Sequence, residues 1–204
     1  MNKYQLYAVF GMLAPIISVV FIALLGWLRP DYSHINNMIS ELAAKGSPNM
    51  HIGIFTMVFT GILLLLFVKG LYLKIPKNKY TKGLVAAIAF FGILACMGSA
   101  VFPCELHGQE FDCPTKIHEI INGLALGALS LAPIMFIVGT KNAQAWKSLH
   151  KISYYIQIIS LIALSLFIIN PEEIIGLLQR IYLGIHFLWI ELLAIRFYTI
   201  FKKT

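Results

Sequence analysis

Six long apolar runs, separated by five short polar connections, are the feature that most constrains the fold of this chain. Hydrophobic residues make up 59% of its 204 residues and charged residues only 12%, whereas about a quarter of the residues in a soluble domain are charged. Each run is about 18 to 24 residues long, and about 20 residues carry a helix across the hydrocarbon core of a bilayer. We expect spans over about residues 7–28, 50–73, 83–102, 117–140, 152–169 and 179–201.

Backbone groups inside lipid must find hydrogen-bond partners within their own segment, so the six runs are predicted to be helices rather than strands. The spans use up most of the chain. We therefore predict an all-α polytopic membrane protein in which residues 1–204 form a single domain, a bundle of six transmembrane helices. The first run is longer than the apolar core of a signal peptide, and no small-x-small cleavage site follows it, so we expect it to remain as the first span.

The charged residues are sorted by sign along the chain. The first, third and fifth connections, with the helix ends beside them, hold eight of the nine acidic residues and four of the sixteen Lys and Arg residues. The termini and the second and fourth connections hold the other twelve basic residues and no acidic residue. Basic loops stay in the cytoplasm, so we predict that both termini are cytoplasmic and that the acidic connections face outward.

The net charge of +7 is no sign of a nucleic-acid partner. It comes from short Lys clusters beside the predicted cytoplasmic ends of the helices, where they would meet anionic lipid headgroups. No basic amphipathic helix or nucleic-acid-binding motif accompanies them. We expect membrane lipid as a partner and no nucleic acid, and the sequence leaves the oligomeric state open.

Two of the three cysteines, Cys104 and Cys113, lie in the third connection. A disulfide between them suits the oxidising compartment on the predicted outer side. The alternative is a metal site that uses both cysteines together with His107 and His118. Thiolate ligands are less expected in an oxidising compartment, so we favour the disulfide.

Polar side chains that could bind a ligand gather in the first connection and in the outer parts of spans two, four and six, with one acid near mid-membrane. Short outer loops must be polar and histidine tolerates an interface, so a purely structural role is given equal weight. In the first connection, the sequence MISELAA is predicted to form a short helix on the membrane surface. The candidate ligand-binding residues are Ser40, Glu41, His51, His118, Glu119, Asn122, His186 and Glu191.

Span four carries a polar stripe above a pair of small residues. His118 and Asn122 share a helix face near the outer interface, and polar groups at that depth usually face the bundle interior or a wet cavity. Gly123 and Gly127 form a G-x-x-x-G pair, a spacing that lets another helix approach closely. A stripe of small residues beginning at Gly92 in span three is the expected counterpart.

Glu191 is predicted to lie near the middle of the bilayer, where a carboxylate is costly unless it is paired, protonated or hydrated. Five residues separate it from both His186 and Arg196, which is about 140° around a helix. It shares a face with neither, so we expect its partner to come from another span. A structural hydrogen bond is favoured over a role in proton relay.

Three segments of the chain resemble a known family. They are RPDYSHINNMISELAAKGSPN after span one, VFPC…CPTKIHEIINGLALG across the third connection, and GLLQRIYLGIHFLWIELLAIR at span six. On these segments the chain resembles the six-span bacterial membrane protein family catalogued as domain of unknown function 998. The resemblance implies an integral membrane protein with six helices and a polar end that faces outward. It implies no catalytic residues. With the charge pattern, it predicts a multi-pass protein of the bacterial cytoplasmic (inner) membrane.

Three functions follow as hypotheses. The first is a binding protein, whose outward-facing polar pocket would hold a lipid headgroup or a small amphiphile. The second is a membrane-embedded hydrolase acting at the outer leaflet, with Ser40 as nucleophile beside a histidine base, or with a metal-bound water. No H-E-x-x-H motif supports the metal version, which would draw on some of His51, His107, His118 and His186.

The third hypothesis is a small proton-coupled transporter that uses Glu191. The chain shows no inverted repeat and no pair of broken helices, which makes this hypothesis the weakest. We rank binding first and hydrolysis second. No cofactor is predicted. A divalent metal is possible in the metal version of the hydrolase, and its candidate ligands are His107, His118 and His186.

Overall fold

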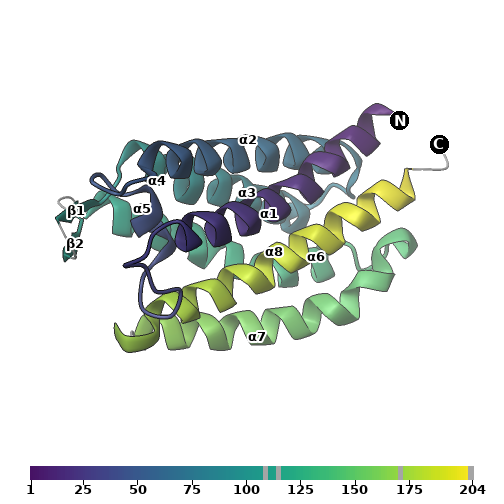
Figure 1. Ribbon diagram of the computed structural model, residues 1–204. Coiled ribbons are helices and arrows are strands. Elements are labelled where there is room, and N and C mark those ends of the chain that lie inside the picture. The colour runs from purple at the N-terminus through teal and green to yellow at the C-terminus, as the bar shows by residue number, and fades with distance from the viewer. Residues whose placement is uncertain (108–109, 114–115, 170–171, 202–204) are drawn as a thin grey trace.

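Figure 1 shows a computed structural model of the protein, which describes residues 1–107, 110–113, 116–169 and 172–201. Within these residues, six helices are long and apolar enough to cross a membrane, which confirms the predicted six-helix membrane fold. Charge sorting remains the basis for their orientation. The six candidate spans are Lys3–Trp27, Met50–Lys74, Lys79–Val101, Ile117–Gly139, Gln144–Ile169 and Ile175–Ile200.

Three of these helices are continuous, namely α1 (Lys3–Trp27), α2 (Met50–Lys74) and α8 (Ile175–Ile200). The other three are composite. The third joins α3 (Lys79–Phe90) through a π-helical stretch, η2 (Phe91–Gly98), to α4 (Ser99–Val101). The fourth joins α5 (Ile117–Ser130) to α6 (Ala132–Gly139), and the fifth joins the 3-10 turn η3 (Gln144–Leu149) to α7 (His150–Ile169).

Two helices begin before their predicted spans because an asparagine caps them. The side-chain oxygen of Asn2 accepts hydrogen bonds from the backbone N–H groups of Tyr4 and Gln5, so α1 begins at Lys3. Asn78 caps the first turn of α3 in the same way. Such caps satisfy N–H groups that the first helical turn leaves without partners, and they extend a helix into polar sequence.

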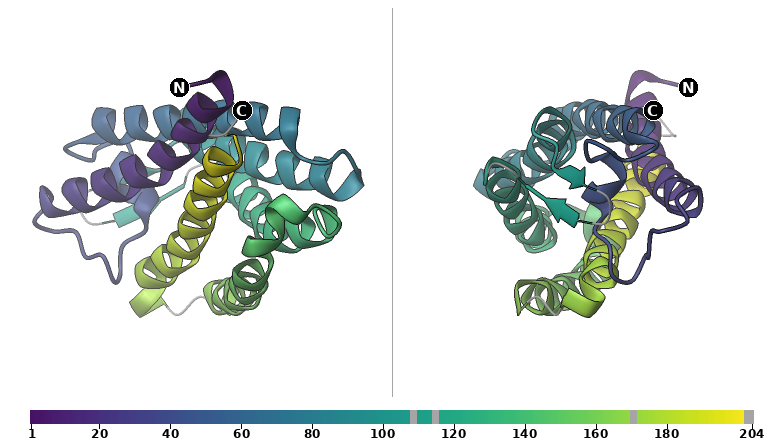
Figure 2. Two further views of the ribbon diagram at one scale, coloured as in Figure 1. Left: turned by 90° about the vertical axis from the view of Figure 1, so that its right-hand side faces the viewer. Right: turned by 60° about the vertical axis from the view of Figure 1, so that its left-hand side comes forward.

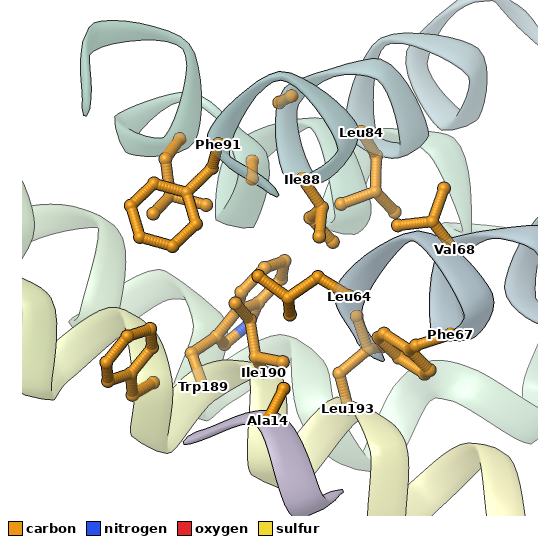
Figure 3. Close-up of a cluster of buried hydrophobic side chains, with 14 of the residues drawn as sticks. Ala14, Leu64, Phe67, Val68, Leu84, Ile88, Phe91, Trp189, Ile190 and Leu193 are labelled. Atoms are coloured by element: carbon orange, nitrogen blue, oxygen red, sulfur yellow. The ribbon is translucent and has the colours of Figure 1, made fainter. Parts of the chain in front are cut away.

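The helices are arranged as a closed ring. Along it, α2 packs on α1 and α3, α6 packs on α3 and α7, and α8 packs on α7 and returns to α1. Figures 1 and 2 show the ring from three sides. Large apolar side chains fill its centre over much of its length, and several are drawn in Figure 3: Leu64, Phe67, Ile88, Phe91, Trp189, Ile190 and Leu193.

The backbones of α2 and η2 approach each other closely at Gly61. A Cβ atom added to Gly61 would lie 2.7 Å from the carbonyl oxygen of Gly92, so only glycine fits without a shift. The stripe of small residues that begins at Gly92 therefore packs on α2. By contrast, a Cβ atom at Gly123 or Gly127 would meet nothing within 4 Å. The prediction that this G-x-x-x-G pair seats another helix was wrong, because α5 turns these glycines toward open space.

A two-stranded antiparallel hairpin, absent from the all-α prediction, lies at one end of the ring. Strands β1 (Glu105–His107) and β2 (Glu110–Asp112) pair with Leu106 opposite Phe111. The disulfide between Cys104 and Cys113 closes the base of the hairpin, as predicted. We call this the hairpin end. It also holds the connection of residues 29–49 and the short helix η4 (Glu172–Ile174).

The connection of residues 29–49 is joined to the hairpin by backbone hydrogen bonds. Lys45 donates to the carbonyl oxygen of Cys104 at 2.8 Å and accepts from the N–H of Leu106 at 2.7 Å. The short helix predicted from MISELAA is present as a 3-10 helix, η1 (Ile39–Ala43). At the opposite end of the ring, the side-chain nitrogen of Asn2 donates to the carbonyl oxygen of Phe201 at 2.8 Å.

Candidate functional site

Two arginines hold the connection of residues 29–49 across the hairpin end, and the first is Arg29. Its side chain is only 3% exposed. It forms an ion pair with Asp31, with a nitrogen–oxygen distance of 3.0 Å, and donates to the backbone carbonyl of Glu41 at 3.3 Å. Buried guanidinium groups require such partners, so these contacts fix η1 against the end of α1.

The second arginine is Arg180 in the first turns of α8. It donates to the carbonyl oxygen of Asn37 at 2.8 Å and to the hydroxyl of Tyr32. Burial raises the pKa of Tyr32 to about 12, so the phenol keeps its hydrogen, which it donates to the carbonyl oxygen of Met38 at 3.0 Å. Sequence reasoning missed this contact. The available signal was an arginine placed inside an apolar helix, since such a group needs acceptors from elsewhere in the fold.

Glu41, a predicted ligand-binding residue, is used to hold this connection. It is buried, and its carboxylate accepts from the backbone N–H of Met38 at 2.7 Å and from the side chain of Asn37 at 2.8 Å. Burial raises the pKa of Glu41, while these hydrogen bonds oppose the rise. Both carboxylate oxygens therefore have partners within the loop.

Beneath this connection and the hairpin, the centre of the ring is hollow. The cavity has a volume of about 700 Å³ and is lined by α1, α2, η2, α5, α8 and η1, with two residues from β2 and one each from α4 and α7. This is within the size range of small-molecule sites. Most of its wall is apolar, and the large side chains in it include Phe21, Ile22, Met57, Phe91, Leu126, Phe167 and Phe187.

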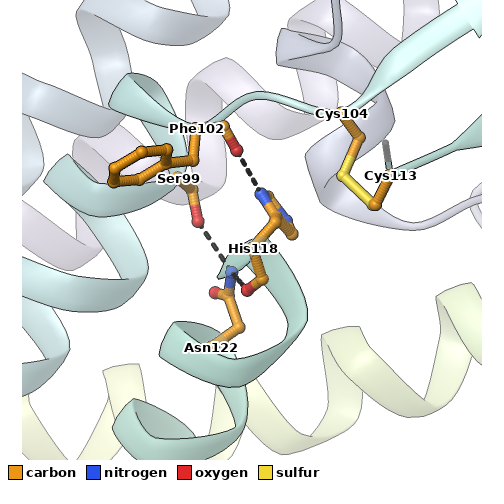
Figure 4. Close-up of a disulfide and its surroundings, with 6 residues drawn as sticks. All are labelled: Ser99, Phe102, Cys104, Cys113, His118 and Asn122. Carbon is orange, nitrogen blue, oxygen red and sulfur yellow. Dashed lines mark hydrogen bonds between the residues drawn. A yellow bond between two sulfur atoms is a disulfide. The ribbon is translucent and has the colours of Figure 1, made fainter. Parts of the chain in front are cut away.

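Three polar lining residues, Ser99 of α4 and His118 and Asn122 at the start of α5, lie close together, as Figure 4 shows. The Nδ1 atom of His118 is 2.9 Å from the carbonyl oxygen of Phe102. The side-chain nitrogen of Asn122 donates to the hydroxyl of Ser99 and to the carbonyl oxygen of His118, both at 2.8 Å. The disulfide lies beside the His118 ring, and Cys113 also lines the cavity. This arrangement fixes the orientation of both His118 and Asn122.

The structure separates the predicted site residues into two groups. Four of them line the cavity: Ser40, His118, Glu119 and Asn122. The others are outside its lining. Glu41 holds the loop, and His51 is exposed in the first turn of α2. His186 is fully buried inside the bundle.

His186 and Glu191 are both incompletely paired. The Nδ1 atom of His186 is 2.9 Å from the carbonyl oxygen of Tyr182, in the preceding turn of α8. Its Nε2 atom, like the Oε2 atom of Glu191, is buried without a hydrogen-bond partner among the residues that the structure describes. We expected another span to supply a hydrogen-bond partner for Glu191, and the structure shows none for its Oε2 atom among the described residues.

The candidate metal ligands are dispersed. His107 is exposed on β1, 3.4 Å from Glu105, and His186 is enclosed in the bundle. Within residues 1–107, 110–113, 116–169 and 172–201, one group has ligand atoms close enough to share an ion, namely Cys104, Cys113 and His118, within 4.8 Å of one another. Its two sulfur atoms are joined in the disulfide, so they do not offer the thiolates that a metal would bind.

A ring of six apolar helices, long enough to cross a bilayer and hollow at one end, defines a multi-pass membrane protein. The family model described as "Protein of unknown function (DUF998)" matches residues 12–196, and the chain belongs to this family. No curated protein and no solved structure matches the chain.

Proposed function

We propose that this protein binds an amphiphile, either a lipid or a small molecule built like one, in the cavity at the hairpin end. The observation that carries this proposal is the division of the cavity lining. Aromatic and aliphatic side chains from all six spanning helices form most of the wall, while His118, Asn122 and Ser99 form a fixed polar edge. An apolar wall accommodates a hydrocarbon chain, and a few convergent polar groups orient a headgroup.

The orientation of the protein supports a site at the outer leaflet. The hairpin end holds the disulfide, which is favoured in an oxidising compartment. The sorted charges support cytoplasmic termini. On this basis the cavity faces the outer side of a bacterial cytoplasmic membrane.

The proposal is tested by filling the cavity. Gly123 lines the cavity and has no atom within 4 Å of its added Cβ, so Gly123→Phe should occupy the space without distorting α5. Gly127 lies one turn further along, is equally open and does not line the cavity, which makes Gly127→Phe the matched control. Lipid retained through purification is quantified by mass spectrometry.

We expect Gly123→Phe to lose the retained lipid and Gly127→Phe to keep it. Equal lipid content in the two variants and the parent protein would overturn the proposal, provided that all three show the same thermal stability. If Gly123→Phe unfolds, Leu183→Trp on the facing helix fills the same cavity and replaces it.

The orientation is tested separately with cysteine labelling. Asn36 is exposed at the hairpin end and Asn142 at the opposite end, between α6 and η3. The native cysteines are either joined in the disulfide or buried. In intact cells, a membrane-impermeant maleimide should label Asn36→Cys and leave Asn142→Cys unlabelled until lysis. The reverse pattern would contradict an outward-facing cavity.

A further inference from the structure

Two polar side chains at the start of α5, His118 and Asn122, present hydrogen-bond acceptors to the cavity, and His118 is the more constrained of the two. It is 8% exposed. Its Nδ1 atom faces the carbonyl oxygen of Phe102, which can only accept, so Nδ1 must carry the hydrogen. In the neutral ring the remaining nitrogen, Nε2, is then an acceptor. It has no hydrogen-bond partner within the described part of the chain, so it remains for a ligand.

Asn122 presents an acceptor for the same reason. Both hydrogens of its side-chain nitrogen are donated within the protein, to Ser99 and to the carbonyl oxygen of His118. Only its carbonyl oxygen is left for a molecule in the cavity. This side of the cavity thus offers one nitrogen and one oxygen, each with its lone pair unused.

The charges of the lining residues also favour a ligand that donates hydrogen bonds. Two carboxylates, Asp112 of β2 and Glu119 of α5, belong to the cavity lining. Among the described lining residues there is no Lys or Arg, and the donors, such as the hydroxyl of Ser40, are neutral. An anion such as a lone phosphate would meet two negative charges here and no compensating cation.

Three basic residues at the hairpin end, Arg29, Lys45 and Arg180, have partners in the protein, and the exposed Lys116 does not line the cavity. Arg29 is paired with Asp31, and Lys45 is 2.9 Å from the carboxylate of Glu105. Arg180 donates to backbone carbonyl groups of the 29–49 connection and of its own helix. These three cations therefore balance acidic and carbonyl groups of the protein rather than the contents of the cavity.

We infer that the headgroup bound in this cavity carries an ammonium group, whose N–H donors would find acceptors among Asp112, Glu119, His118 and Asn122. This inference rests on the proposed amphiphile binding and specifies its chemistry. An ammonium supplies several donors and a positive charge, and hydrogen bonds between charged groups are the stronger ones. The ammonium could belong to a membrane lipid or to a free alkylamine, and the two sources are separated by experiment.

The test uses native mass spectrometry of the detergent-solubilised protein. The probes are an alkylamine, an alkyl alcohol and an alkyl phosphate of one chain length, with phosphatidylethanolamine and phosphatidylglycerol of identical acyl chains. The fraction of probe binding that the Gly123→Phe substitution abolishes is assigned to the cavity. We expect the amine to bind about tenfold more tightly than the alcohol, the amount that one charge-assisted hydrogen bond contributes, and the phosphate to bind weakest.

Neutral variants test which carboxylates produce this preference. Glu119→Gln and the double variant Asp112→Asn with Glu119→Gln should remove the advantage of the amine over the alcohol. Glu173→Gln is the matched control, since Glu173 is an exposed acid at the same end that does not line the cavity. A preference confined to phosphatidylethanolamine would assign the ammonium to a membrane lipid, and one confined to the alkylamine would assign it to a free amine.

The outcomes separate the two proposals. Cavity binding that favours neither the alkylamine over the alcohol nor phosphatidylethanolamine over phosphatidylglycerol, or that favours the alkyl phosphate, overturns the ammonium inference and leaves amphiphile binding intact. A preference that survives in the double variant also overturns it. Binding that Gly123→Phe does not reduce removes both proposals together.

Discussion

Replacing Gly61 with alanine should destabilise the protein, whereas the same change at Gly127 should not. An added Cβ at Gly61 would lie 2.7 Å from the backbone oxygen of Gly92 and 2.9 Å from Cγ of Met97. Crowding of this kind costs about 1–3 kcal/mol. At Gly127 nothing lies within 4 Å of the added atom. Alanine is favoured over glycine inside a helix by about 1 kcal/mol, and this gain applies at both positions.

Because the helix-propensity gain cancels in the comparison, the difference between the two variants isolates the crossing of α2 with η2. Gly61→Ala should be about 1–3 kcal/mol less stable than Gly127→Ala. Each kcal/mol lowers the melting temperature of a protein of this size by roughly 2–4 °C. The assay is thermal unfolding in one detergent, followed by tryptophan fluorescence. Equal melting temperatures, or a lower one for Gly127→Ala, would refute the helix arrangement described above.

Three further predictions concern the hairpin end. Reducing the disulfide should lower the melting temperature, since closing so short a loop stabilises by roughly 2–3 kcal/mol; a scan with and without reductant measures this, and no shift would contradict it. Arg180→Ala should leave the carbonyl oxygen of Asn37 without its donor, at about 1–3 kcal/mol, and limited proteolysis should then cut residues 29–49 faster than in Arg196→Ala. The hydrogen-bonded ion pair with Lys45 holds the pKa of Glu105 below its ordinary value. The ion pair therefore stabilises the folded protein fully at pH values above the ordinary pKa, and this stabilisation is lost as the pH falls through the lowered pKa. Lys45→Met should therefore flatten the fall in melting temperature on the acid side.

The features that the sequence predicted are those that depend on local signals. Span length follows from hydrophobicity alone, and pairing of Cys104 with Cys113 follows from their short separation on the predicted oxidising side. The position of His118 and Asn122 on one helix face also follows from helical periodicity. Each of these predictions requires only a stretch of contiguous sequence, and the structure agrees with each.

The features that it did not predict depend on which helices become neighbours. Gly123 and Gly127 have a spacing typical of helix packing, yet the crossing forms at Gly61, where no motif marks it. His186 and His118 are both candidate ligand-binding residues from the sequence, but α8 turns His186 into the bundle, away from the cavity lining. Helical periodicity in the sequence predicts which residues share one face of a helix. It does not predict which other helix packs against that face.

Closure of the ring of helices sets an order on biogenesis. Helix α1 is made first and packs on α8, which follows the other five helices along the chain. Until α8 inserts, the cavity lacks one wall, and η1 lacks Gln179, whose side-chain oxygen accepts from the N–H of Ile39 at 2.7 Å. A ribosome-bound chain that stops before α8 therefore carries an open crescent of helices, and the cavity is complete only after the sixth helix has been released into the membrane.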